Sequence, residues 1–214
     1  MKIGLLSYRS HPYSGGQGIY IRHLSKALKN LGHDVSVISG QPYPDLDKSI
    51  NLIKVPGLGL FESGARLSAF QLSFLWKPLN LYEWFTVITG GFPEPYTYGR
   101  RAYKLLKESK FKFDILLDNQ SLSSSLLRIQ QDYPLAVTIH HPITKDHKLE
   151  IDNASGWKEK LSSKRWHNFL PMQKRVAPKL RNIICVSQPS KEDVISEFKV
   201  DEERITVIPN GIDI

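Results

Sequence analysis

Cysteine and long apolar runs are almost absent from this sequence, and each absence excludes a class of protein. Cys185 is the only cysteine among 214 residues, so the chain forms no internal disulfide and no cluster of thiolates holds a metal. No 18 consecutive apolar residues occur, as a membrane-spanning helix would need. The apolar start of the chain ends at Arg9, too early for a signal-peptide core. We therefore expect a cytoplasmic protein.

Acidic residues are outnumbered by basic ones, which bears on the partners of the protein. The chain has 29 Lys and Arg against 21 Asp and Glu, a net charge of +8. Such a surface attracts nucleic acid, anionic lipid or phosphorylated small molecules, and charge alone does not choose among them. The excess lies mainly in residues 100–112 and 145–181. Runs of this kind are usually solvated helix faces.

Short apolar segments alternate with helical patterns along most of the chain. Strands are expected near residues 2–8, 35–39, 52–55, 113–118, 135–140, 183–187 and 204–208. Helices are expected from the glycine turn to residue 31, at 121–131, within 157–180 and at 189–198. Because parallel strands need crossover connections, this alternation predicts an α/β fold, a Rossmann-like doubly wound parallel sheet, in one domain over residues 1–208.

Residues 56–98 interrupt this alternation as an insertion after the third strand. The insertion carries ten of the 22 aromatic residues of the chain: Phe61, Phe70, Phe74, Trp76, Tyr82, Trp84, Phe85, Phe92, Tyr96 and Tyr98. We expect one or two helices with an irregular linker. Aromatic rings with basic Lys77, Arg100 and Arg101 nearby suggest a surface for a membrane or a lipid acceptor. A small separate core, or a dimer contact, explains the aromatic residues equally well.

A glycine turn joins the first strand to the first helix. In Gly15-Gly16-Gln17-Gly18, free backbone N–H groups and the positive end of the helix can hold a phosphate or a sugar. The third glycine of a dinucleotide fingerprint is replaced by Ile21, and no acidic residue ends the second strand. The two sequence features specific to a nicotinamide or flavin site, the third glycine and the acidic residue, are therefore both missing. A tight turn selected for steric reasons is the alternative to a ligand site.

Polar side chains follow the fourth and fifth expected strands, at the edge where open α/β sheets bind ligands. Asn119 and Gln120 can bond sugar hydroxyls, although the segment that contains them can equally cap the next helix. His140 ends the fifth strand. A metal site at this edge is disfavoured by the irregular spacing of its potential ligands, which are His140, His141, Asp146 and His147.

Three further residues are candidate anion ligands. Ser187 and Lys191 stand where the sixth strand leads into a helix, so a hydroxyl, a helix N-terminus and an ammonium group can meet a phosphate there. A serine that only closes a strand ahead of a helix is the simpler explanation. Arg9, just past the first strand, is a similar candidate.

The order of these motifs resembles the N-terminal, acceptor-side half of GT-B glycosyltransferases of retaining family 4. The resemblance begins with the double-glycine loop, the Leu24–Leu28 helix and the segment Gly32-His33-Asp34-Val35 that starts the second strand. It continues through the strands that end near Asp118 and His140. Its most specific part is the closing run Val207-Ile208-Pro209-Asn210-Gly211-Ile212-Asp213.

The resemblance implies a hexosyltransferase that uses a nucleotide-sugar donor and retains the anomeric configuration, with no metal cofactor. It implies that a C-terminal domain outside this sequence binds most of the donor, that 209–214 begin the linker to it, and that this half alone does not catalyse transfer. In the family, a histidine at the place of His140 lines the cleft near the transferred sugar and the acceptor. The implied acceptor is a sugar. A lipid acceptor, with peripheral contact of a cytoplasmic protein at the inner face of the membrane, is the expectation from the aromatic and basic insertion.

Two other classes of function stay open at this point. A nucleic-acid-binding protein would explain the basic surface, but the sequence carries no aromatic and basic signature of a known module, so no nucleic-acid partner is expected. A stand-alone carbohydrate-binding or regulatory module would explain why the sequence contains only one half of a glycosyltransferase.

Overall fold

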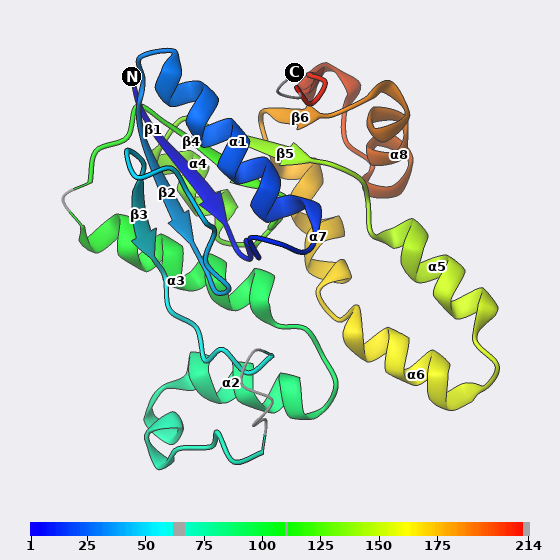
Figure 1. Cartoon of the computed structure of the whole chain (residues 1–214). Helices are drawn as coiled ribbons and strands as arrows, with labels where there is room; N and C mark the ends of the chain where they lie inside the picture. Colours follow the sequence, from blue (N-terminus) through cyan, green and yellow to red (C-terminus); the bar gives the residue numbers. More distant parts are fainter. Residues whose placement is uncertain (62–66, 110, 212–214) are drawn as a thin grey trace.

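The computed structural model describes residues 1–61, 67–109 and 111–211 and has a parallel sheet at its centre (Figure 1). The seven strands lie in the order β3-β2-β1-β4-β5-β6-β7, and every neighbouring pair is parallel. They are β1 (Lys2–Ser7), β2 (Asp34–Ser39), β3 (Asn51–Lys54), β4 (Ile115–Asn119), β5 (Leu135–Ile139), β6 (Ile183–Cys185) and β7 (Ile205–Val207). The predicted Rossmann-like fold is confirmed.

Helices connect the strands and cover the sheet. The α-helices are α1 (Gly16–Asn30), α2 (Pro78–Ile88), α3 (Glu94–Glu108), α4 (Leu126–Asp132), α5 (Thr144–Asn153), α6 (Trp157–Trp166), α7 (Leu170–Val176) and α8 (Gln188–Phe198). Within the described residues there are three short 3-10 helices: η1 (Leu72–Trp76), η2 (Ala177–Lys179) and η3 (Glu202–Arg204). Among the described residues, no helix combines the length and apolar character needed to cross a membrane.

The two faces of the sheet bury two separate apolar clusters. Successive side chains of a strand point to opposite faces, so β1 contributes to both. Ile3 and Leu5 pack in one cluster with Ile21 of α1. Leu6 packs in the other, larger cluster with Tyr98 of α3. Burial on both faces explains why central strands such as β1 are apolar over most of their length and why the sequence pattern identifies them.

Two helix predictions need correction. The helix expected at 121–131 begins only at Leu126, because Gln120 and Leu122 adopt left-handed backbone conformations with φ of 53° and 47°. The helical stretch expected within 157–180 consists of α6, α7 and η2, with a turn at His167 between the first two. Helix α5 was not predicted, because Thr144 is its only buried residue and an apolar stripe is therefore missing.

Four helices, η1, α2, α5 and α6, lie beyond the carboxyl ends of the strands, and we call them the outer helices (Figure 1). The insertion, residues 56–98, contains η1, α2 and the start of α3, so its predicted helical character is confirmed. Its helix α2 ends at Ile88, just before the pair Gly90-Gly91, where Gly90 has a φ of 84°. Helices α5 and α6 form a hairpin that projects away from the sheet; we call residues 144–166 the arm. Residues 212–214, within the predicted linker, lie outside the described part of the chain.

Candidate functional site

The sheet order places a change of direction between β1 and β4. From β1 the chain continues outward to β2 and β3, whereas from β4 it continues the other way to β5, β6 and β7. The loops that follow β1 and β4 therefore diverge at their carboxyl ends, which is where open α/β sheets bind their ligands. The glycine loop, Asn119, Gln120 and His140 all belong to this edge.

Close backbone contact explains the glycine loop after β1. Gly15 has a φ of 75°, a conformation that side chains disfavour, and α1 begins at the next residue. A Cβ atom on Gly18 would lie 2.1 Å from the carbonyl oxygen of His11, so only glycine lets the first turn of α1 pack on this loop. The His11 ring orders the loop further, because its Nδ1 accepts the N–H groups of Tyr13 and Ser14. The first-turn N–H groups of α1 need partners from outside the helix.

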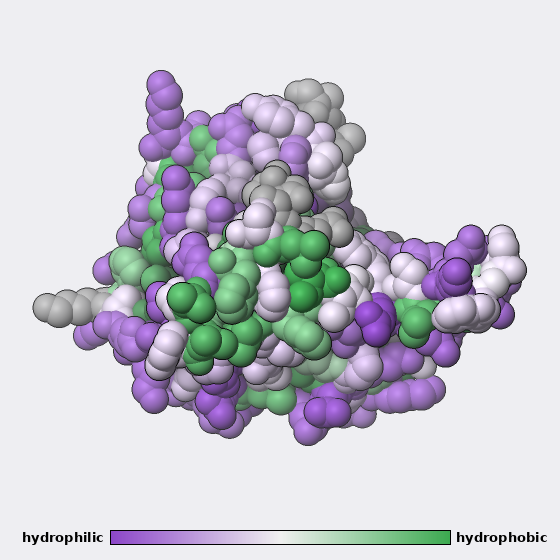
Figure 2. Space-filling model, turned by 90° about the horizontal axis from the view of Figure 1, so that it is seen from below, coloured by the Kyte–Doolittle hydropathy of each residue, from purple (hydrophilic) through white to green (hydrophobic). Residues whose placement is uncertain are grey.

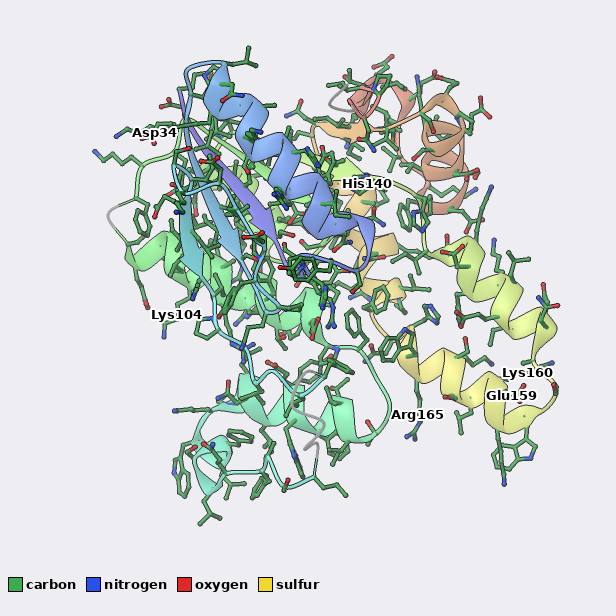
Figure 3. All side chains as sticks on the ribbon, viewed as in Figure 1. Asp34, Lys104, His140, Glu159, Lys160 and Arg165 are labelled. Atoms are coloured by element: carbon green, nitrogen blue, oxygen red, sulfur yellow. The ribbon has the colours of Figure 1, made fainter. Side chains whose placement is uncertain are left out.

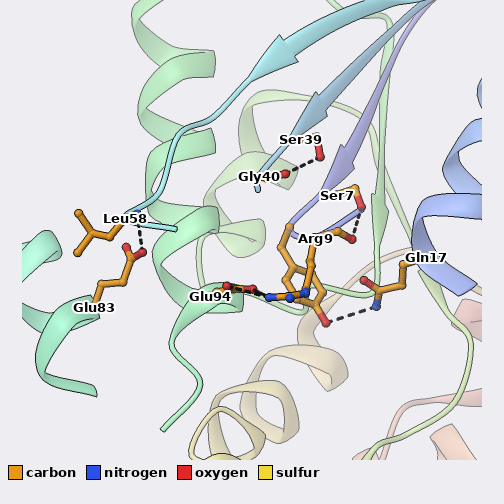
Figure 4. Close-up of polar contacts among 9 residues, drawn as sticks. Ser7, Arg9, Gln17, Ser39, Gly40, Leu58, Glu83 and Glu94 are labelled. Carbon is orange, nitrogen blue, oxygen red and sulfur yellow. Dashed lines mark hydrogen bonds and ion pairs between the residues drawn. The ribbon is translucent and has the colours of Figure 1, made fainter. Parts of the chain in front are cut away.

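Gln17 connects the start of α1 to the end of β1. Its Nε2 donates to the hydroxyl of Tyr8 across 3.4 Å (Figure 4). Burial of Tyr8 raises the pKa of its hydroxyl to about 12, so this group stays protonated near neutral pH. The side chain of Gln17 therefore has a protein partner, and the part of the loop that can receive a ligand is its backbone.

His140 follows β5 and is held on two sides. Its ring Nε2 lies 2.8 Å from Oδ1 of Asn119, and its backbone N–H donates to Oε1 of Gln120 at 2.8 Å. Tyr20 of α1 meets the His140 ring edge to face, with 4.7 Å between ring centroids. Figure 3 shows His140 between the foot of α1 and the start of the arm. The structure thus brings the predicted histidine next to the helix that the glycine loop starts.

The surroundings of His140 determine its protonation. Burial lowers its pKa, and the neighbouring His141 lowers it further, so the ring is neutral near pH 7. Because Oδ1 of Asn119 accepts hydrogen bonds, Nε2 carries the proton and Nδ1 keeps a lone pair. His140 thus presents a hydrogen-bond acceptor to a hydroxyl or an N–H group.

Asn119 and Gln120 are almost completely buried, which defines their role. Gln120 joins the ends of β4 and β5, because its side chain bonds both the N–H of His140 and the carbonyl of His141. Only 4% of Gln120 and 1% of Asn119 is exposed. Both residues position His140 in this structure; direct bonding to a sugar stays a prediction. Nδ2 of Asn119 has no protein partner within the described part of the chain.

Asp118 holds the loop after β4 in shape, whereas the sequence pattern indicates only that the segment Asp118 to Ser121 can cap the next helix. Its carboxylate accepts the N–H and the hydroxyl of Ser121, at 2.8 and 2.6 Å. Complete burial raises the pKa of this carboxyl to about 6. The segment does not cap a helix directly, since α4 begins five residues after Ser121. Nothing in the local sequence reveals that this aspartate is buried.

The three candidate anion ligands have partners inside the protein. Arg9 donates to both carboxylate oxygens of Glu94, at 3.0 and 3.1 Å (Figure 4). Ser187 caps α8 by accepting the N–H of Ser190. Lys191 forms an ion pair with Glu202 at 2.8 Å. The structural explanation of Ser187 is confirmed, and binding of an anion by any of the three stays a prediction.

Clustered metal ligands are not found in the described residues, where no three His, Cys, Asp or Glu side chains come together. Of the candidate metal ligands, His141 and Asp146 pair at 3.2 Å, and the rings of His147 and His167 stack with centroids 4.5 Å apart. Tyr20 is the contact residue that sequence reasoning missed. A single tyrosine on an amphipathic helix gives no signal that separates it from the core.

Comparison with known proteins gives a family and relatives of the same fold. The family model for Glycosyltransferase Family 4 matches residues 14–214. The chain is 44% identical over 215 aligned positions to the MMP alpha-(1->4)-mannosyltransferase of Mycolicibacterium hassiacum. The alignment covers 100% of this chain and 52% of that protein, so the chain spans about half the length of its relative.

Solved structures of glycosyltransferases share the fold at low sequence identity. WaaG, a glycosyltransferase involved in lipopolysaccharide biosynthesis, aligns with a TM-score of 0.60 and 14% identity over 99% of this chain and 45% of its own. A glycosyltransferase from Rickettsia africae ESF-5 aligns with a TM-score of 0.51 and 17% identity, over 99% and 44%. TcCGT1, solved in complex with UDP, aligns with a TM-score of 0.52 and 11% identity, over 98% and 50%.

Proposed function

The chain belongs to glycosyltransferase family 4, and from that premise we propose that the intact protein transfers a mannosyl group from a nucleotide-sugar donor to a glycan acceptor, with retention of configuration. The donor sugar is proposed from the 44% identity to a mannosyltransferase over the whole chain. The alternatives, a nucleic-acid-binding protein or a stand-alone carbohydrate-binding module, receive no support from these relatives.

One observation carries the proposal: the first turn of α1, Tyr20 and His140 come together at the carboxyl edge of the sheet. The N-terminus of α1 suits a phosphate of the donor or of the acceptor, because its N–H groups point outward and its dipole favours negative charge. The neutral His140 suits a sugar hydroxyl, which would donate to its free Nδ1. Sugar transfer requires a phosphate group of the donor and a hydroxyl of the acceptor to lie side by side.

We assign the acceptor side of the cleft to this chain and most of the donor side to the remainder of the protein. The mannosyltransferase relative is about twice as long as this chain, which leaves room for a second, nucleotide-binding domain. Residues 209–214 are then the start of the linker. Transfer breaks the bond between the anomeric carbon and a diphosphate oxygen, which keeps the electron pair. It forms a bond from that carbon to the oxygen of the acceptor hydroxyl, whose proton goes to the departing diphosphate. The helix N-terminus stabilises the charge on the departing diphosphate.

Replacement of His140 tests the proposal. In the intact protein, His140→Ala should reduce turnover about 100-fold or more, the usual loss when a positioned hydrogen-bonding group is removed from a reacting centre. Unfolding free energy should fall by about 2 to 3 kcal/mol, because the variant loses the ring contact with Tyr20 and leaves Oδ1 of the buried Asn119 without its partner. The matched control is His141→Ala, which removes an exposed neighbour. Release of nucleotide diphosphate in the presence of acceptor measures both, and unchanged turnover of His140→Ala would remove this histidine from the site.

Peripheral contact with the inner face of an anionic membrane is a second proposal, favoured by the outer surface of the insertion. Figure 2, which views the molecule from below, shows apolar side chains gathered there. Trp76 is 78% exposed, and its neighbours Leu72 and Leu75 are more than half exposed. The exposed Lys77 and Arg100 add positive charge, whereas Arg101 is paired with Glu83 inside the fold. Exposed aromatic and basic side chains together suit the headgroup region.

A further inference from the structure

An open groove separates the arm from the turn that follows α2. It has a volume of about 520 Å³, within the range of pockets that hold drug-sized ligands, so it has room for more than one sugar ring. Its lining consists of Phe61, Val87, Gly90, Gly91, Glu150, Asn153, Ala154, Glu159, Ser162, Ser163 and Trp166. None of the residues at the carboxyl edge of the sheet contributes to this lining, so the groove is a separate site.

Aromatic side chains form one part of this groove and are fixed by their neighbours. The ring of Trp166 packs against Phe61 and Phe92, with centroids 5.7 and 5.1 Å away, and 43% of this tryptophan stays exposed. Arg165 ties the two walls together, because its guanidinium donates to the carbonyl of Thr89 at 2.8 Å. An exposed indole on a rigid support can stack on the apolar C–H face of a sugar ring.

Polar groups of the arm face the same groove. Glu150 accepts the hydroxyl of Ser163 through Oε2, and Glu159 accepts the N–H of Ser155 through Oε2. These bonds fix both carboxylates, while Oε1 of each has no protein hydrogen bond among the described residues. Fixed carboxylate oxygens accept strong hydrogen bonds from pairs of sugar hydroxyls. The hydroxyl of Ser162 and the amide of Asn153 add further bonding groups.

The charge of the lining decides which ligands it suits. Among the residues that the structure describes, two glutamates and no lysine or arginine line the groove, although the whole chain carries a net charge of +8. A phosphate or another anion would be repelled at this point, whereas a neutral polyhydroxylated chain meets no such penalty. Aromatic stacking combined with fixed carboxylates favours a carbohydrate over a purely apolar ligand.

We propose that the groove between the arm and the Gly90-Gly91 turn binds a neutral oligosaccharide, several units away from the sugar that reacts. This rests on the proposed function in one respect, namely that the oligosaccharide is the acceptor chain. The arm begins at Thr144, four residues after His140, and extends away from the carboxyl edge of the sheet (Figure 3). The groove along the arm therefore leads away from the candidate site. The site therefore selects acceptors by the length of their chain.

Calorimetry tests this proposal. It compares the binding of mannose and of a mannose tetrasaccharide to the intact protein in the absence of donor. The tetrasaccharide should bind more tightly than the monosaccharide. Ser162→Tyr places a ring in the groove and should weaken tetrasaccharide binding about tenfold, leaving the monosaccharide unaffected. The matched control is Leu161→Tyr, which adds the same ring at an exposed position of α6 outside the lining.

A second variant keeps the test independent of how Ser162→Tyr folds. Trp166→Leu removes the stacking surface but keeps an apolar side chain, and should also weaken tetrasaccharide binding about tenfold. If both variants bind the tetrasaccharide as tightly as the unaltered protein does, or if chain length has no effect on binding, the proposal is wrong.

Transfer assays on the same proteins separate the two proposals. If the unaltered protein transfers sugar to the monosaccharide, and the groove variants raise KM only for the tetrasaccharide with kcat unchanged, both proposals are supported. If transfer occurs but the variants change neither chain-length dependence nor binding, the groove proposal alone fails. If no transfer occurs with any nucleotide sugar while the tetrasaccharide binds and both variants weaken this binding, the proposed function fails, and the groove stands as an oligosaccharide site without its role for an acceptor.

Discussion

The carboxyl edge of the sheet and the outer helices differ in how far their side chains are exposed to solvent. At the edge, side chains are at most 4% exposed in Asp118, Asn119 and Gln120. Each of them forms hydrogen bonds to residues in the loops after β4 and β5. In the outer helices, α6 has no buried residue, and η1 exposes most of its apolar side chains. Substitutions of these buried edge residues therefore change folding and function together, whereas substitutions of exposed residues in the outer helices can separate them.

The largest expected effect is at the glycine loop. Gly18→Ala should lower the unfolding free energy by about 3 kcal/mol or more, because the new Cβ atom would collide with the backbone of His11. Gly16→Ala is the matched control, since no atom lies within 4 Å of its added Cβ, and it should change stability by less than about 0.5 kcal/mol. Urea denaturation measures both variants. Equal effects would show that α1 does not pack on the loop as described.

A smaller effect, dependent on pH, is expected from the buried carboxyl at the edge. The pKa of Asp118 in the folded protein, about 6, is higher than its ordinary value of 3.8. Asp118 therefore contributes most to stability below pH 4, and this contribution is lost as the pH rises through 6, by about 2 to 3 kcal/mol in total. Asp118→Asn should not show this particular loss.

Unfolding free energies of both proteins, measured from pH 3 to pH 8, test the Asp118 prediction. The difference between the two curves isolates Asp118, because the other carboxyl groups titrate in both. Ser121→Ala serves as the control for the hydrogen bond alone, since it removes the hydroxyl donor and keeps the buried charge. Parallel curves for the unaltered protein and Asp118→Asn would mean that this carboxyl keeps an ordinary pKa.

The smallest effect on stability is expected in the outer helices. Trp76→Ser should change the unfolding free energy by less than about 0.5 kcal/mol, because its side chain is mostly in water. The same variant should lose most of any binding to anionic vesicles at low salt, measured by co-sedimentation of the intact protein. Phe74→Ser, at a buried position of the same 3-10 helix, provides the contrast and should be clearly destabilising. An unaltered protein that stays in the supernatant would refute the membrane proposal.

The contrast between the buried sheet and the exposed outer helices also explains which parts of the structure the sequence predicts. The strands and the amphipathic helix α1 were found because residues such as Ile3, Leu5 and Ile21 are buried in a regular pattern. The glycine loop is identified because strand ends are recognisable and its chemistry is local, whereas His140 at the end of the fifth expected strand is singled out by the family resemblance. The Rossmann-like sheet and the edge that carries the candidate site follow from these signals.

Contacts between distant segments could not be predicted in this way. The ion pair of Arg9 with Glu94 joins residues 85 positions apart, and no local pattern connects them. The late start of α4 depends on the bonds that Asp118 makes to Ser121, which become apparent only when the loop is folded. The groove is assembled from the insertion and the arm, two segments without regular apolar periodicity.

The bond from Arg165 to the carbonyl of Thr89 has a consequence for the width of the groove. It connects two stretches of chain 76 residues apart, one in the insertion and one in the arm. A deletion or duplication within either stretch would shift one partner and widen or close the space between them. The width of the groove therefore depends on the lengths of both segments, although they are far apart in the sequence.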